Sequence, residues 1–333
     1  MADNNDNTRR VAIACQGGGS HTAFTAGALM KLLKEKGEEG HDYEIVALSG
    51  TSGGSICALL AWYGLLVNDT DKAIELLDSF WEDDSANSFQ DRILNEWLLQ
   101  TNRFFGNIGG TPTISPYNTY TSSWAGNQLK NMLERHVDFE RLQGLVRASS
   151  PMLLIGAADV VSGEFKAFSS YRDRINVDMI LASAALPTLF KAVHTNGGVY
   201  WDGLFTQNPP VRELPDAKPN EIWVIQIDPQ SRAAEPKTMP NIMDRRNELA
   251  GNLSLYQETY FIKKINEWVV EGSLSGTKHE VIELKWIEML WDLDSESKLN
   301  RDPRFLQGLM AYGEEQAEAF LDKELTGVGG RTS

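Results

Sequence analysis

"YEIVALSGTSGGSICALLAWYGLL", residues 43–66, joins a short apolar run, a glycine-rich turn and a longer apolar run. Residues 43–50 have the apolar, β-branched character of a buried strand, and the apolar residues 56–66 predict a helix. The small residues at 51–55 predict a tight turn between the two. A strand that leads directly into a buried helix is the repeating unit of α/β proteins, so this stretch predicts an α/β fold.

A second unit of the same kind precedes this one. Residues 10–14 form an apolar strand pattern, the triple glycine 17–19 follows, and residues 23–36 carry apolar side chains at helical spacing up to Gly37. Two such units in succession predict a mostly parallel central sheet with helices on both faces.

The rest of the chain carries further strand and helix signals. The expected elements are strands within 151–169 that turn at Ser162–Gly163, a helix at 177–186, a strand at 221–228, a helix at 240–271, a strand at 279–287 and a helix at 303–325. No repeat or clear linker divides the chain, which favours one domain over residues 1–333. That domain would comprise a motif-bearing core at about 9–230, a helical insertion at about 69–146 and a C-terminal extension at about 231–333.

Composition limits the partners of the chain. Its 333 residues carry a formal net charge of −15, which excludes nucleic acid as an expected partner because Lys and Arg patches are scarce. The same charge weakens attraction to anionic lipid, so a transient membrane-surface contact would use apolar surface. Because the polar start MADNNDNTRR is no signal peptide and the apolar run 56–67 is too short for a bilayer, a cytoplasmic protein is expected. Signal-less secretion and the oligomeric state stay open.

Two cysteines, Cys15 and Cys57, are the whole thiol content of the chain. Neither has a second ligand at metal-binding spacing, so no metal site or disulfide framework is predicted. Both lie in apolar segments, where cysteine behaves as a small buried hydrophobic residue.

The turn between the predicted strand and helix contains a nucleophile pattern. Residues 50–54 fit G-x-S-x-G, which lifts Ser52 on a sharp turn above the N-terminus of a helix. The flanking glycines allow the turn, and the helix N-terminus favours negative charge on the serine oxygen. Ser52 is therefore the candidate nucleophile.

A serine nucleophile needs a base, and two candidates follow it in the chain. His279 is the only histidine after Asp202, but it precedes an ordinary strand pattern and is expected to be a surface residue. Asp202 lies beside Trp201 in a segment, 197–210, whose Gly, Asn and Pro content predicts a loop. Partial desolvation there would make the carboxylate a stronger base. Taken alone, Asp202–Gly203 is better explained as a simple turn.

Four segments together resemble the patatin-like phospholipases, serine acyl hydrolases with a Ser-Asp dyad. The matching segments are QGGGSHTAFTAGAL (16–29), GTSGG (50–54), ASAALPTLFKAV (182–193) and WDGLFTQNPPV (201–211). They occur in the family's order, and the resemblance spans roughly residues 11–211.

The resemblance implies a three-layer α/β/α sandwich and a set of site residues. Ser52 would be the nucleophile, Asp202 the base, and the backbone N–H groups of Gly17, Gly18 and Gly19 the oxyanion hole. The implied activity is hydrolysis of lipid carboxylic esters through an acyl-enzyme, of phospholipase A, lysophospholipase or esterase type, with a lipid or ester substrate as partner and neither cofactor nor metal.

The sequence departs from the family's pattern at three positions. His21 and Thr22 stand where the family usually has Arg or Lys and then Gly, and Leu204 replaces a glycine that often follows Asp-Gly. Losing the basic residue predicts that a phosphate headgroup has one cationic partner fewer near the oxyanion loop.

Other functions fit parts of the sequence. Nucleotide binding is disfavoured, because the triple glycine is followed neither by Gly-Lys-Ser/Thr nor by the G-x-G-x-x-G spacing. A carboxylesterase, a polyester depolymerase and a non-catalytic lipid-binding scaffold remain as alternatives. Aromatic residues in 69–105 could form a lipid-facing lid or ordinary core; they are Trp81, Phe89, Trp97, Phe104 and Phe105.

Overall fold

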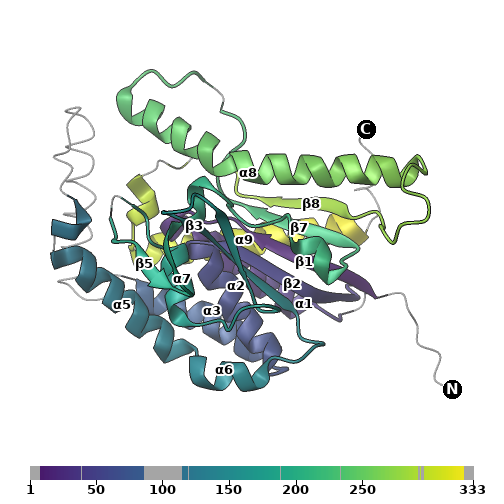
Figure 1. Cartoon of the computed structure of the whole chain (residues 1–333), viewed down its shortest axis with the longest axis horizontal. Helices are drawn as coiled ribbons and strands as arrows, with labels where there is room; N and C mark the ends of the chain where they lie inside the picture. Colours follow the sequence, from purple (N-terminus) through teal and green to yellow (C-terminus); the bar gives the residue numbers. More distant parts are fainter. Residues whose placement is uncertain are drawn as a thin grey trace.

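The computed structural model describes residues 8–38, 40–85, 115–118, 120–187, 189–232, 234–291, 293 and 296–325. Its centre is an eight-stranded mixed sheet with the order β5-β6-β3-β2-β1-β7-β8, and β4 pairs with β3 (Figure 1). The strands are β1 (Arg9–Cys15), β2 (Tyr43–Thr51), β3 (Met152–Asp159), β4 (Phe165–Ser169), β5 (Val193–Thr195), β6 (Gly198–Asp202), β7 (Glu221–Gln226) and β8 (Glu283–Glu288). The five strands β3, β2, β1, β7 and β8 run parallel, and β4, β5 and β6 add antiparallel pairs at one side.

Helices cover both faces of the sheet. They are α1 (Ala23–Glu35), α2 (Gly53–Leu66), α3 (Thr70–Asp84), α5 (Tyr120–His136), α6 (Phe139–Leu145), α7 (Val177–Ser183), α8 (Met239–Val270) and α9 (Pro303–Leu325). Alternate residues of β1 face opposite layers, as strand geometry requires. Val11 and Ile13 belong to the apolar cluster shared with α1, α2, α3 and α9, whereas Ala12 and Ala14 pack with α8 residues such as Leu255. This arrangement confirms the three-layer α/β/α fold.

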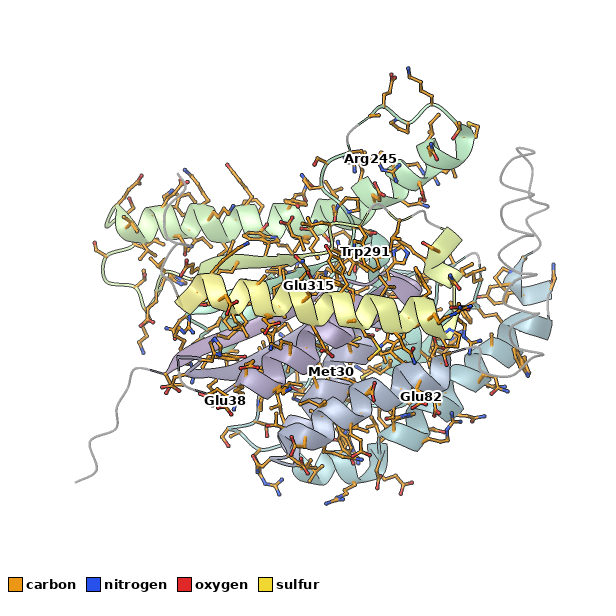
Figure 2. All side chains as sticks on the ribbon, turned by 180° about the vertical axis from the view of Figure 1, so that it is seen from behind. Met30, Glu38, Glu82, Arg245, Trp291 and Glu315 are labelled. Carbon is orange, nitrogen blue, oxygen red and sulfur yellow. The ribbon has the colours of Figure 1, made fainter. Side chains whose placement is uncertain are left out.

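The C-terminal residues complete the same sheet and layers. β8 lies parallel to β7 along Glu221–Gln226, and α9 packs closely on α1. A Cβ on Gly27 of α1 would lie 1.9 Å from the backbone oxygen of Met310, so a glycine is needed at the crossing of the two helices. Figure 2 shows α9 as the yellow helix at the front of the molecule.

Most of the expected elements are found close to their predicted positions, but one segment was assigned wrongly. Residues 197–210 were expected to form a loop, and their first part is instead strand β6, of which Asp202 is the last residue. β6 pairs with the edge of β3, with Ala157 opposite Asp202. Tertiary pairing therefore overrides the local Gly and Asn content, and it gives the carboxylate a fixed position that a loop would not.

Candidate active site

Ser52 occupies the turn between β2 and α2. Its backbone has φ 55° and ψ −131°, a conformation that costs a non-glycine residue about 1–3 kcal/mol and is held by its surroundings. A Cβ on Gly50 would lie 2.3 Å from the oxygen of Gly54, and one on Gly54 would lie 2.3 Å from the oxygen of Cys15. Both glycines of G-x-S-x-G are thus required by close backbone packing at the turn.

Asp202 lies beside Ser52 and is almost completely buried, with 3% of its surface exposed. Its side chain interacts by hydrogen bond with that of Ser52, and its Oδ1 accepts a 2.9 Å hydrogen bond from the N–H of Leu204. Burial raises the pKa of the Asp202 carboxyl to about 7, although both hydrogen bonds act to lower it. Such a carboxylate is a much stronger base than an ordinary aspartate and is still substantially ionised near neutral pH.

The C-terminal end of α7 and the residues that follow it hold both of these residues in place. The Oγ of Ser183 accepts a 3.0 Å hydrogen bond from the N–H of Ser52 and donates a 2.6 Å hydrogen bond to the oxygen of Gly156. Two residues later, the oxygen of Ala185 accepts a 3.0 Å hydrogen bond from the N–H of Asp202. The segment 182–193 was part of the family resemblance, but no role was predicted for Ser183. The only sequence signal for such a role was a serine at the end of an apolar helix.

The glycine loop lies directly against the nucleophile turn. A Cβ on Gly17 would lie 2.1 Å from the oxygen of Thr51 and 2.9 Å from the Cβ of Ser52. However, the N–H of Gly17 donates a 2.7 Å hydrogen bond to Oδ1 of Asn208, which corrects its expected role as an oxyanion donor. Asn208 was missed as a supporting residue, although it stands in the quoted segment WDGLFTQNPPV.

Gly18 and Gly19 are placed differently from Gly17. Both line the same cavity as Ser52. Within the part of the chain that the structure describes, their N–H groups donate to no other protein atom. An oxyanion hole requires backbone donors without a protein partner that lie in the same cavity as the serine, and Gly18 and Gly19 meet this condition.

Position 21 carries no positive charge, but another residue near it does. His21 is buried and close to Ser297, with 2.7 Å between Nε2 and Oγ, and burial together with Lys298 lowers its pKa to about 3. It is therefore neutral. Lys298 lies in the cavity wall beside Gly18 and Gly19, and its Nζ is 2.6 Å from Oδ1 of Asp228.

A second cation, Arg301, lines the same wall of this cavity. Its Nε donates a 2.5 Å hydrogen bond to the backbone oxygen of Asp84 and is 3.5 Å from Oδ1 of that residue. Burial raises the pKa of the Asp84 carboxyl, while Arg301 acts against this shift. Position 21 therefore carries no charge, as the sequence predicts, and the two cations of the cavity could not be foreseen from it, because sequence patterns near residue 21 say nothing about residues almost 280 positions later.

The cavity that joins these groups is mostly apolar and has a volume of about 310 Å³. Besides Ser52 and Asp202, its wall includes Ile56, Phe80, Trp81, Leu186, Leu189 and Phe190. Trp81 is 4% exposed and belongs to the core as well as to this wall. The other four aromatic residues of the lid hypothesis, Phe89, Trp97, Phe104 and Phe105, lie outside the described residues. An apolar cavity next to a serine suits the acyl chain of an ester.

The other candidate residues do not line this cavity. His279 is exposed, as expected. Cys15 and Cys57 are buried free thiols, as expected, and burial raises both of their pKa values. Among the described residues, no group of His, Cys, Asp and Glu side chains is arranged to hold a metal ion, and no described helix is long and apolar enough to cross a membrane.

Solved structures and a family model are similar to this chain. The structure is similar to VipD from Legionella pneumophila, with 14% identity and a TM-score of 0.46, over 95% of this chain and 67% of that one. It is also similar to the type III effector protein ExoU, with 15% identity and a TM-score of 0.37, over 94% of this chain and about half (53%) of that one. A search of curated proteins found no match. A family model described as patatin-like phospholipase matches residues 13–215, which include Ser52 and Asp202. The chain therefore belongs to the patatin-like phospholipase family, a family of lipid acyl hydrolases.

Proposed function

We propose that this protein hydrolyses carboxylic esters of lipids with Ser52 as nucleophile and Asp202 as general base. The observation that carries the proposal is the buried Asp202 carboxyl in hydrogen-bond contact with Ser52 at one end of an apolar cavity. Gly18 and Gly19 line the same cavity and would supply the oxyanion donors.

The reaction would proceed through an acyl-enzyme. Asp202 takes the proton from the Ser52 hydroxyl as its Oγ attacks the ester carbonyl, and the oxyanion accepts hydrogen bonds from Gly18 and Gly19. The carbon–oxygen bond to the leaving alcohol then breaks, and protonated Asp202 returns its proton to that oxygen. Water repeats the sequence on the acyl-enzyme, giving the free acid and restoring the Ser52 hydroxyl.

A phospholipid fits the site better than a small soluble ester or a polyester. The apolar wall suits an acyl chain, and Lys298 and Arg301 provide positive charge in the same cavity for a phosphate group. A non-catalytic lipid-binding role is disfavoured, because the serine, its buried base and the strained turn are all retained.

The direct test is labelling with a fluorophosphonate probe, which reacts with activated serines. We expect covalent modification at Ser52, located by peptide mass spectrometry, since this serine has a base within hydrogen-bond contact. Labelling should weaken as the pH falls below about 7, the pKa of Asp202. An active esterase whose label maps to another serine would refute the proposal.

The charge of Lys298 should decide how well anionic lipids are used. We expect Lys298→Gln to lower the ratio of phosphatidylglycerol hydrolysis to diacylglycerol hydrolysis about tenfold or more, because a charge-assisted contact to phosphate is lost. Lys298→Arg keeps the charge and should keep most of the ratio. Lys72→Gln, on an exposed part of α3, is the matched control. An equal loss on both lipids in Lys298→Gln would assign Lys298 a structural role through Asp228 instead.

A further inference from the structure

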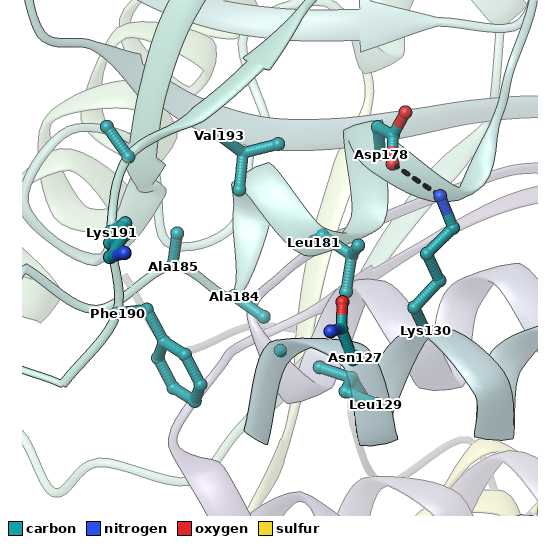
Figure 3. Close-up of a pocket in the computed structure, with 12 residues that line it drawn as sticks. Asn127, Leu129, Lys130, Asp178, Leu181, Ala184, Ala185, Phe190, Lys191 and Val193 are labelled. Carbon is teal, nitrogen blue, oxygen red and sulfur yellow. Dashed lines mark hydrogen bonds and ion pairs between the residues drawn. The ribbon is translucent and has the colours of Figure 1, made fainter. Parts of the chain in front are cut away.

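A second apolar cavity lies next to the candidate active site. It has a volume of about 300 Å³ and is built by α5, α7 and the chain that follows α7 to β5 (Figure 3). Its apolar wall consists of Leu129, Leu181, Ala184, Ala185, Phe190 and Val193. An ion pair lies at one side, with 3.3 Å between Nζ of Lys130 and Oδ1 of Asp178 (Figure 3).

The two cavities share part of their walls. Leu129, Ala184 and Phe190 line both of them. Ala184 lies between Ser183, which accepts from the N–H of Ser52, and Ala185, which accepts from the N–H of Asp202. Part of the partition between the cavities therefore belongs to the segment that contacts Ser52 and Asp202, and Leu129 of α5 and Phe190 form the rest.

We propose that the second cavity binds the second acyl chain of a two-chain lipid while the first chain is cleaved at Ser52. The inference rests on the proposed ester hydrolysis and extends it to a substrate class, the diacyl lipids. Three features of the structure support it: the cavities have similar volumes, both walls are largely apolar, and a shared partition that includes Ala184 separates them. A lipid whose two chains leave adjacent carbon atoms can place one chain on each side of such a partition. Apolar walls favour alkyl chains because burial removes the chains from water.

Gly126 offers a way to fill the second cavity without disturbing the first. It lies within α5 and lines only the second of the two. A Cβ placed on it would meet no atom within 4 Å, and a leucine is a better helix former than a glycine. Gly308 is the matched control: it is a helical glycine in α9 with equally open space around it, and it lines neither cavity.

The experiment compares a diacyl phospholipid with the lysophospholipid of the same headgroup and acyl chain, both in mixed micelles. We expect the series Gly126→Ala, Gly126→Leu and Gly126→Trp to lower the ratio of diacyl to lysophospholipid turnover progressively, by tenfold or more for Trp. Gly308→Leu should keep the wild-type ratio. A ratio that does not change along the series, or an equal loss on both lipids, would overturn the proposal.

A binding measurement tests the second-chain site independently of catalysis. In the Ser52→Ala background, a dialkyl ether phospholipid should bind more tightly than its single-chain counterpart, and Gly126→Trp should remove that advantage. Equal affinities for the two ether lipids would overturn the second-chain site. If wild-type protein binds the dialkyl lipid preferentially but hydrolyses no ester, the proposed function fails while the second-chain site stands.

Discussion

Ser52→Ala is expected to lower kcat/KM for every ester substrate by about 10⁴-fold or more, the scale seen when a serine nucleophile is removed. The reason is that no other hydroxyl is held in contact with the buried Asp202 carboxyl in the described structure. The fold should persist, because alanine leaves the Gly50 and Gly54 backbone contacts of the turn unchanged. Turnover of p-nitrophenyl esters and of phospholipids, with circular dichroism on the same samples, measures both effects.

The control for this substitution is another serine on a helix. The Oγ of Ser79 donates a 2.7 Å hydrogen bond to the oxygen of Glu75 within α3, and Ser79 does not line the active-site cavity. Ser79→Ala should therefore retain wild-type turnover. If folded Ser52→Ala protein kept more than a few per cent of its ester hydrolysis, Ser52 would not be the nucleophile.

The fold was predictable because its decisive patterns are local. Strand, turn and helix follow one another without interruption in residues 9–35 and again in 43–66, so both units and their parallel pairing could be inferred from neighbouring residues. Gly50 in the turn of residues 50–54 is required by its close backbone contact with Gly54 in the same turn. Such constraints leave a clear trace in sequence.

The rest of the site depends on contacts between distant segments, and no local pattern encodes them. Asn208 reaches back to Gly17, and Lys298 reaches the glycine loop from the C-terminal third. The second cavity likewise arises where α5 meets the segment after α7. Asp202 was identified through its motif, but its place at the end of a strand depends on pairing with β3.

Because the pKa of Asp202 is raised, activity and stability should change in opposite directions as the pH changes. In the folded protein the carboxyl binds its proton up to about pH 7, whereas in the unfolded chain it loses the proton near pH 4, the usual aspartate value. The folded state therefore binds more protons between these two pH values, so the contribution of Asp202 to stability falls as the pH rises from about 4 to about 7. The proposed mechanism needs the ionised form, which is the form that destabilises the fold.

Asp202→Asn should consequently abolish turnover and stabilise the protein. Loss of the base should lower kcat/KM at least about 10³-fold, and the wild-type kcat/KM should fall about tenfold for each pH unit below about 7. Asparagine has no charge to bury, so the variant should unfold at a higher temperature than wild type at pH 8. About three pKa units separate the folded and unfolded states, which sets an upper limit of about 4 kcal/mol for this gain.

The pH dependence of this difference in stability distinguishes a buried general base from a merely structural aspartate. Thermal unfolding of both proteins from pH 4 to pH 8 should show the advantage of Asp202→Asn shrinking as the pH falls, and becoming small by pH 4, where the wild-type carboxyl is protonated in the folded state and about half protonated in the unfolded chain. Asp159→Asn is a matched control, since Asp159 lies on the neighbouring strand β3 and its pKa is lowered by hydrogen bonds from Ser162 and Val161. That variant should lose stability at pH 8 rather than gain it. An Asp202→Asn protein that is less stable than wild type at pH 8, or a wild-type kcat/KM that stays constant from pH 5 to pH 8, would contradict the assignment of Asp202 as a buried base with a raised pKa.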